Sequence, residues 1–136
     1  MGAQKNEKKL KRVTLEQLLA AKTQREKDKL KVEEIEVPSL GGTLLFKRPA
    51  DEDIFDIVNA IDKDDDIRVT LDQMASIIYK CCDQLHDKEL YETMEAGDPV
   101  DVVFMTMSSS DIIQVGNKVC GLNELYADAG EQVKNS

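Results

Sequence analysis

The alternation of apolar and acidic residues over residues 32–37 constrains the fold of this chain more than any other feature. Ile35 and Val37 alternate with glutamates, which is the two-residue period of a strand with one buried face. Pro38 ends the run because it has no N–H for a ladder, and Ser-Leu-Gly-Gly then supplies a turn before a second apolar run. The pattern predicts a β-hairpin near residues 32–48. A lone hairpin is only marginally stable in water, so it must pack on helices or on another copy.

The rest of the chain predicts helices. Two capping boxes, at Thr14–Gln17 and Thr70–Gln73, mark helix starts. One further helix is expected from Pro49, with the apolar stripe Ile54, Ile57, Val58 and Ile61, and another over about residues 71–84, with Leu71, Met74, Ile78, Cys82 and Leu85 on its apolar face. A short helix is expected from Asp87 through Met94. Two more are expected, one after Asp98-Pro99 with Val100, Val103, Phe104 and Met107 facing inward, and a last one that ends at Gly121 and buries Ile112, Val115 and Val119. The sequence therefore predicts a mainly α fold, a compact helical domain of about five or six helices with one N-terminal β-hairpin.

Charge and composition divide the chain into three parts. Residues 1–31 contain ten Lys or Arg and four Asp or Glu, whereas the remainder contains eight and 23. We expect a disordered basic N-terminus over residues 1–13, a single helical domain over 14–126, and a disordered tail over 127–136. A net acidic body argues against nucleic acid as a partner, because phosphate contacts require clustered cations.

The sequence predicts neither membrane insertion nor secretion. No apolar run approaches the ~20 residues of a membrane span. The N-terminal lysines are not followed by the apolar stretch of a signal peptide. We therefore expect a soluble intracellular protein.

The acidic run Asp62–Asp66 imitates the start of a calcium-binding loop, with carboxylates at its first, third and fifth positions. Such a loop requires Gly at its sixth position and a bidentate Glu at its twelfth. This chain has Ile67 and Gln73 there, so a solvated connector is expected instead of a calcium site.

The three cysteines and the single histidine make the other candidate for chemistry. A nucleophile formed by Cys81 or Cys82 with His86 would require an exposed, activated thiolate, and Cys82 is predicted to lie in the core, where thiols are inert. Adding Cys120 does not give the paired spacing of a zinc site. We expect no catalytic, metal-binding or cofactor-binding residues, although a thiol enzyme remains the alternative from a different class.

Two segments of the chain resemble a known family. Residues 14–58, which begin TLEQLLAAKTQREKDKLKVEEIEVPSLGG, resemble the front of the XkdN-like tail assembly chaperones of tailed phages and of phage-like elements in Gram-positive bacteria. Residues 91–126, YETMEAGDPVDVVFMTMSSSDIIQVGNKVCGLNELY, are similar to the same family. The resemblance rests on the amino-acid sequence of these segments and on the order of the predicted elements. Neither segment contains a catalytic signature.

The resemblance implies a non-enzymatic protein in the cytoplasm of the bacterial host. Such a chaperone binds the tape-measure protein and keeps it soluble while the tail tube polymerises, and it is not expected in the mature virion. A longer frameshifted form, as many phages make, would add the tail tube protein as a partner. The alternative is a tail structural or completion subunit that stays in the particle.

Five apolar residues are the candidate partner contacts. Leu15, Leu18 and Leu19 lie on a predicted helix whose second half is too polar to be buried. Leu44 and Phe46, from the second hairpin strand, are further candidates. For each of the five, the alternative is a place in the chain's own core. A hairpin edge also invites pairing with another copy, so a homo-oligomer is among the expected partners.

Overall fold

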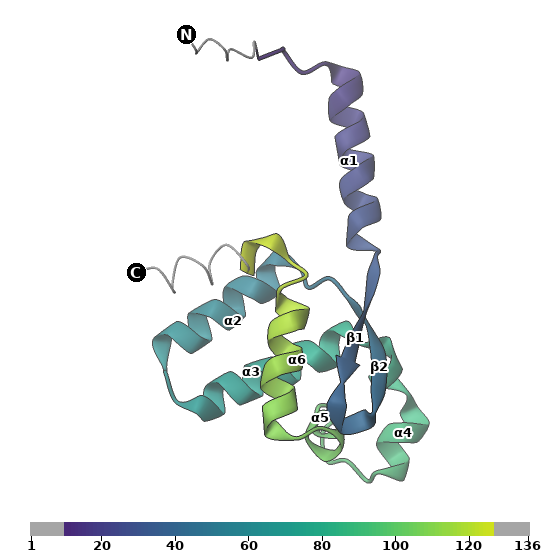
Figure 1. Ribbon diagram of the computed structural model, residues 1–136, viewed down its shortest axis with the longest axis vertical. Helices are drawn as coiled ribbons and strands as arrows, with labels where there is room; N and C mark the ends of the chain where they lie inside the picture. Colours follow the sequence, from purple (N-terminus) through teal and green to yellow (C-terminus); the bar gives the residue numbers. More distant parts are fainter. Residues whose placement is uncertain (1–9, 127–136) are drawn as a thin grey trace. The chain divides into compact units, whose positions relative to one another are not determined.

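The computed structural model describes residues 10–126 of the 136-residue chain. In chain order the elements are α1 (Leu15–Lys29), β1 (Val32–Val37), the 3₁₀ helix η2 (Pro38–Leu40), β2 (Gly42–Lys47), α2 (Asp51–Lys63), α3 (Ile67–Cys81), the 3₁₀ helix η3 (Asp83–His86), α4 (Lys88–Thr93), α5 (Asp101–Thr106) and α6 (Ser109–Cys120) (Figure 1). The predicted mainly α fold with one N-terminal hairpin is confirmed.

The chain consists of two compact units, Met1–Leu30 and Lys31–Ser136. The single helical domain expected over residues 14–126 stays a prediction. Residues 1–9 and the expected tail 127–136 lie outside the described residues.

The hairpin forms as the alternating pattern predicted. β1 and β2 pair antiparallel in a register that runs from Val32 opposite Lys47 to Val37 opposite Gly42. The turn between them uses Gly41 in the left-handed region, with φ of 68°, a conformation that glycine adopts without a steric penalty. The register places Ile35, Val37 and Phe46 on one face, and all three are buried.

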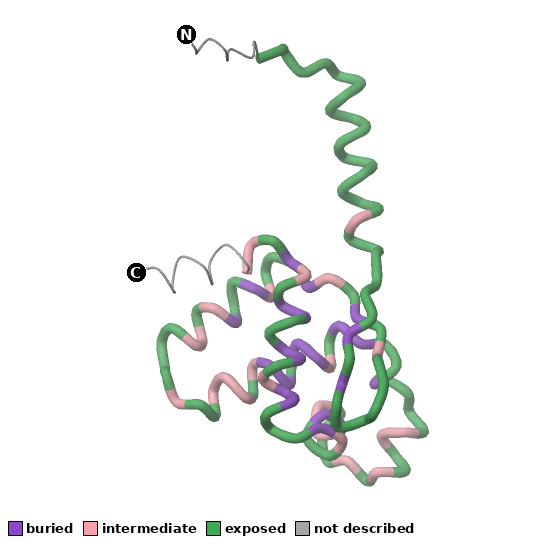
Figure 2. The backbone as a smooth tube through the Cα atoms, viewed as in Figure 1, coloured by how far each residue is buried: buried purple, intermediate pink, exposed green. Residues whose placement is uncertain are grey.

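The core of the Lys31–Ser136 unit is built around α3 and α6. These helices pack against each other, α2 packs on α3, and the hairpin contacts both, with β1 against α6 and β2 against α3. The buried residues gather in these elements (Figure 2). The largest fully buried side chains are Phe46, Ile54, Met74, Ile78, Ile112, Val37, Val102, Val103, Val115 and Val119. Each such side chain contributes roughly 1.5–3 kcal/mol through its removal from water.

Two polar contacts fix the ends of α6 to distant parts of the chain. At its start, the buried carboxylate of Asp111 accepts hydrogen bonds from the Ser39 backbone N–H, at 2.6 Å, and from the Ser39 hydroxyl in the hairpin turn. Beyond its end, the buried amide of Asn123 donates to the Pro49 carbonyl oxygen, at 2.9 Å, and to Asp51 at the start of α2. The hairpin and α2 are thereby held at opposite ends of one helix.

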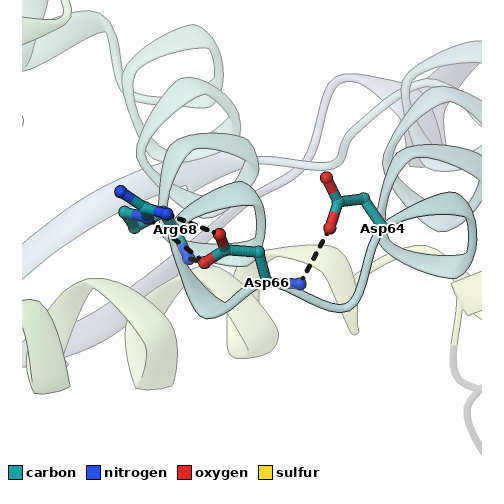
Figure 3. Close-up of polar contacts among 3 residues, drawn as sticks. All are labelled: Asp64, Asp66 and Arg68. Carbon is teal, nitrogen blue, oxygen red and sulfur yellow. Dashed lines mark hydrogen bonds and ion pairs between the residues drawn. The ribbon is translucent and has the colours of Figure 1, made fainter.

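The prediction that Thr70–Gln73 caps a helix is wrong, because α3 begins at Ile67, four residues before the predicted start at Leu71. Asp66 is the N-cap: its carboxylate accepts from the Arg68 backbone N–H at 2.9 Å and pairs with the Arg68 guanidinium at 2.8 Å (Figure 3). The Asp66 N–H in turn donates to Asp64, at 3.1 Å. An aspartate N-cap with a bonded arginine takes precedence over the threonine further along.

Two further helix predictions are displaced. α5 begins at Asp101 instead of at Pro99, and its buried residues are Val102 and Val103, whereas Phe104, predicted to face inward, is exposed. α3 ends at Cys81, so Cys82 and Leu85 reach the core from the segment after the helix.

Gly116 allows the close contact between α3 and α6. A Cβ atom at this position would lie 2.6 Å from Cβ and 2.7 Å from Sδ of Met74. Met74 is itself almost wholly buried and cannot move aside freely. Glycine here is therefore required by the packing of two helices, despite its unfavourable helix propensity.

We predict that Gly116→Ala lowers the free energy of unfolding by about 1–3 kcal/mol, because overpacking forces the two central helices apart. Chemical denaturation followed by circular dichroism measures this. Gly42→Ala is the matched control, since a Cβ at Gly42 meets nothing within 4 Å. Equal stability of the two variants would contradict the packing assignment.

Candidate partner-binding surface

Helix α1 begins with the capping box predicted from the sequence. The Thr14 hydroxyl accepts the Gln17 backbone N–H at 3.1 Å, and the Gln17 side chain accepts the Thr14 N–H at 2.8 Å. Two N–H groups that the first turn leaves unpaired are thus satisfied locally. The start of α1 is determined by its own residues.

The leucines of α1 are exposed. Leu15, Leu18 and Leu19 retain 71%, 59% and 57% of their accessible surface, and α1 contains no buried residue. They occupy neighbouring positions on two successive turns, so they form one apolar surface. Of the five candidate contacts, these three are the ones that the structure leaves accessible.

The second half of α1 is stabilised by contacts within the helix. Lys22 Nζ lies 3.1 Å from Glu26 Oε2, and Gln24 donates to Asp28 at 3.0 Å. Exposed pairs of this kind contribute only about 0.3–0.5 kcal/mol each. A 15-residue helix with such support is marginal by itself, so a bound partner would stabilise it.

The hairpin candidates lie differently. Phe46 is fully buried and Leu44 is half-buried against the core. The interpretation of Phe46 as a partner contact is therefore corrected: its side chain fills the space between the hairpin and the helices. Leu45, on the opposite face of the same strand, is the exposed apolar residue of β2.

Self-pairing through the hairpin edge is disfavoured by two features. β1 carries three glutamates, Glu33, Glu34 and Glu36, which would face like charges on a second copy. On β2, the Leu45 N–H donates to the Gln84 side chain at 2.9 Å. Acidic side chains and an occupied N–H are both ways of protecting a sheet edge.

Two large exposed apolar residues, Phe55 on α2 and Ile67 at the start of α3, were not among the predicted partner contacts. The signal for Phe55 was present, because it falls outside the buried stripe that contains Ile54 and Ile57. Ile67 was not identified as a helix residue because the true start of α3 was not predicted.

The thiols and the histidine are not brought together as a reactive pair. His86 Nε2 lies 2.6 Å from the Tyr79 carbonyl oxygen, and its ring packs on the Tyr79 ring with centroids 4.4 Å apart. Cys81, Cys82 and Cys120 are free and buried. Burial raises the pKa of Cys81 to about 11 and that of Cys120 to about 12, and it also raises the pKa of Cys82.

The acidic loop before α3 functions as a helix cap. The hydrogen bond from the Arg68 side chain lowers the pKa of Asp66, which keeps the capping carboxylate ionised. Within residues 10–126, no three His, Cys, Asp or Glu side chains are grouped so as to hold a metal ion. In the same range, none of the helices has both the length and the apolar composition that a membrane crossing requires.

Comparison of the chain with protein-family models, with curated proteins and with solved structures finds no match.

We predict that native Cys81, Cys82 and Cys120 react with iodoacetamide at pH 8 about 100-fold more slowly than in the denatured chain. A thiol with a pKa of about 11 is ionised in roughly one molecule in a thousand at that pH, and burial also excludes the reagent. Mass spectrometry of quenched time points measures the labelling. Rapid labelling of any one native cysteine would contradict the burial and support thiol chemistry.

Proposed function

We propose that this chain is a tail assembly chaperone of a phage or prophage and that it acts without catalysis. It binds the tape-measure protein and keeps that protein soluble while the tail tube assembles. The resemblance of residues 14–58 and 91–126 to the XkdN-like chaperones motivates the proposal. The observation that carries it is the exposed leucine surface of α1, a helix with no buried residue.

The chemistry of α1 suits reversible capture of an apolar helix. Full burial of Leu15, Leu18 and Leu19 would contribute roughly 1.5–3 kcal/mol per side chain. Association itself costs several kcal/mol in lost translational and side-chain freedom. The balance is a modest affinity for each site, which allows polymerising tube subunits to displace the chaperone.

The proposed chaperone has a cellular location and a defined time of release. The chaperone acts in the cytoplasm of the bacterial host and is released before the tail is complete. A longer frameshifted form, if the gene encodes one, would connect the captured tape-measure protein to the tail tube protein. Tape-measure proteins with long apolar helices need such cover because exposed apolar surface promotes aggregation.

A tail structural or completion subunit is the competing assignment. Mass spectrometry of purified tails separates the two, because a structural subunit stays in the particle and a chaperone does not. Detection of this chain in tails at a fixed ratio to the tube protein would replace the chaperone assignment.

We predict that Leu18→Glu/Leu19→Glu abolishes co-purification with the tape-measure protein from the same gene cluster and returns that protein to the insoluble fraction. Two charges on the apolar surface of α1 would have to be desolvated on binding. Co-expression followed by affinity capture and gel quantification measures both effects.

Leu40→Glu is the control, because Leu40 is an exposed leucine that belongs to η2 and not to α1. The fold should tolerate all three changes, since the residues are exposed, and thermal melts verify this. Wild-type chain that neither captures the tape-measure protein nor changes its solubility would refute the proposed function.

A further inference from the structure

The leucine surface of α1, formed by Leu15, Leu18 and Leu19, is continued along the same side of the helix by cations. Lys22 follows Leu18 after four residues, and Arg25 follows Lys22 after three. Such intervals place side chains next to one another on one side of a helix. The apolar first half of α1 therefore leads directly into a basic second half.

The cations on this side of α1 are accessible and only partly paired. Lys22 Nζ lies 3.1 Å from Glu26 Oε2, but the two side chains retain 72% and 61% of their accessible surface, so the pair contributes little to stability. Within residues 10–126, the side chains of Arg25 and Lys29 have no hydrogen-bond or ionic partner. These two cations are available to a ligand.

The carboxylates of this segment do not compensate its positive charge. Residues 10–31 contain seven Lys or Arg and three Asp or Glu. Of the three carboxylates, Glu26 pairs with Lys22, and Asp28 accepts a hydrogen bond from Gln24. A complementary ligand must therefore offer apolar side chains to the leucines and carboxylates to the cations.

The spacing of these groups on α1 determines the spacing that the ligand needs. Arg25 lies seven residues beyond Leu18, which is about two turns and ~10 Å along the helix. A helix that lies along α1 would need the same separation between its apolar contacts and its carboxylates. Both sets must also share one face of the ligand helix.

We propose that α1 binds an acidic amphipathic helix in which apolar side chains and carboxylates follow one another on one face, about two turns apart. The apolar side chains cover the leucines, and the carboxylates pair with Arg25 and Lys29. The inference rests on the proposed function, because it names the kind of tape-measure segment that α1 captures. The charges also select one direction of binding, since a reversed segment would have to desolvate its carboxylates over the leucines.

A second copy of this chain offers a poorer match to the leucines, although its larger unit is acidic. On α2, all of which the structure describes, Phe55 is the one large apolar side chain that is exposed. Glu52 and Asp56 lie beside it on the same helix. One phenylalanine among carboxylates cannot cover three leucines that extend over two turns of α1.

Fluorescence anisotropy of two labelled synthetic peptides with the full chain tests the proposal. Both peptides are amphipathic helices with leucines on one face; the face continues with glutamates in one peptide and with lysines in the other. At about 0.15 M salt, we expect the glutamate peptide to bind at least about tenfold more tightly. Leu18→Glu should weaken binding of the glutamate peptide more than about tenfold, because the leucine surface is then lost.

Arg25→Glu and Lys27→Glu are a matched pair, since they make the same charge reversal on different sides of α1. Arg25 lies about two turns beyond Leu18 and on its side of the helix, whereas Lys27 lies about two and a half turns beyond it, on the opposite side. We expect Arg25→Glu to weaken the glutamate peptide at least about fivefold and to reduce the preference over the lysine peptide. Lys27→Glu should change neither by more than about twofold, because screening limits charge effects across the helix.

Both substitutions place a carboxylate in the second half of α1, so circular dichroism should find the same helix content in the two variants. Equal affinity of the wild type for the two peptides would overturn the proposal, as would equal effects of Arg25→Glu and Lys27→Glu. Self-association of the chain that Leu18→Glu abolishes, without binding of the glutamate peptide, would replace the proposed ligand by a second copy.

Capture of the tape-measure protein is a separate measurement on the same wild-type chain. Capture without a preference for the glutamate peptide would refute this inference and leave the proposed function in place. A preference for the glutamate peptide without capture would refute the proposed function and leave the ligand chemistry of α1 in place.

Discussion

The larger unit depends on the close contact between α6 and Met74 of α3. Only glycine at position 116 allows this contact, because a Cβ atom there would clash with Met74. It brings two amphipathic helices together so that their valines and isoleucines share one core. The hairpin turn then attaches to the start of α6 through Asp111, and α2 attaches beyond its end through Asn123. The Lys31–Ser136 unit thereby completes its own core from its own residues.

Helix α1, in contrast, contributes no residue to a core. Its capping box and intrahelical pairs are local, and none of its residues is buried. Burial of its exposed leucines against an apolar partner would be favourable, because it would remove their surface from water. The proposed function uses this property.

Local patterns in the sequence predicted much of the fold. The hairpin followed from the alternation around Ile35, and the start of α1 followed from the capping box at Thr14. The start of α3 was not predicted correctly. Asp66 and Thr70 are two candidate N-caps four residues apart, and Asp66, whose carboxylate bonds to Arg68, is the N-cap in the structure. The importance of Gly116 was not predictable either, since a helical glycine shows its packing partner only in three dimensions.

The candidate surface was predicted in part, for a related reason. The polar second half of α1 indicated that this half would not be buried, whereas the leucines of the first half could have belonged to the core and are exposed in the structure. For Phe46 the structure has the alternative, a place in the core; the sequence left this open because an alternating strand shows which residues share a face but not which helices cover that face. Hydrogen–deuterium exchange on the dilute chain, alone and with the tape-measure protein, tests the central claim that α1 is a binding helix with no buried residue of its own. We predict that backbone amides of α1 exchange rapidly in the free chain while those of α3 and α6 exchange slowly, and that α1 becomes protected when the tape-measure protein binds. The account would be contradicted if the α1 amides were as protected as those of α3 in the free chain, or if the tape-measure protein left their exchange unchanged.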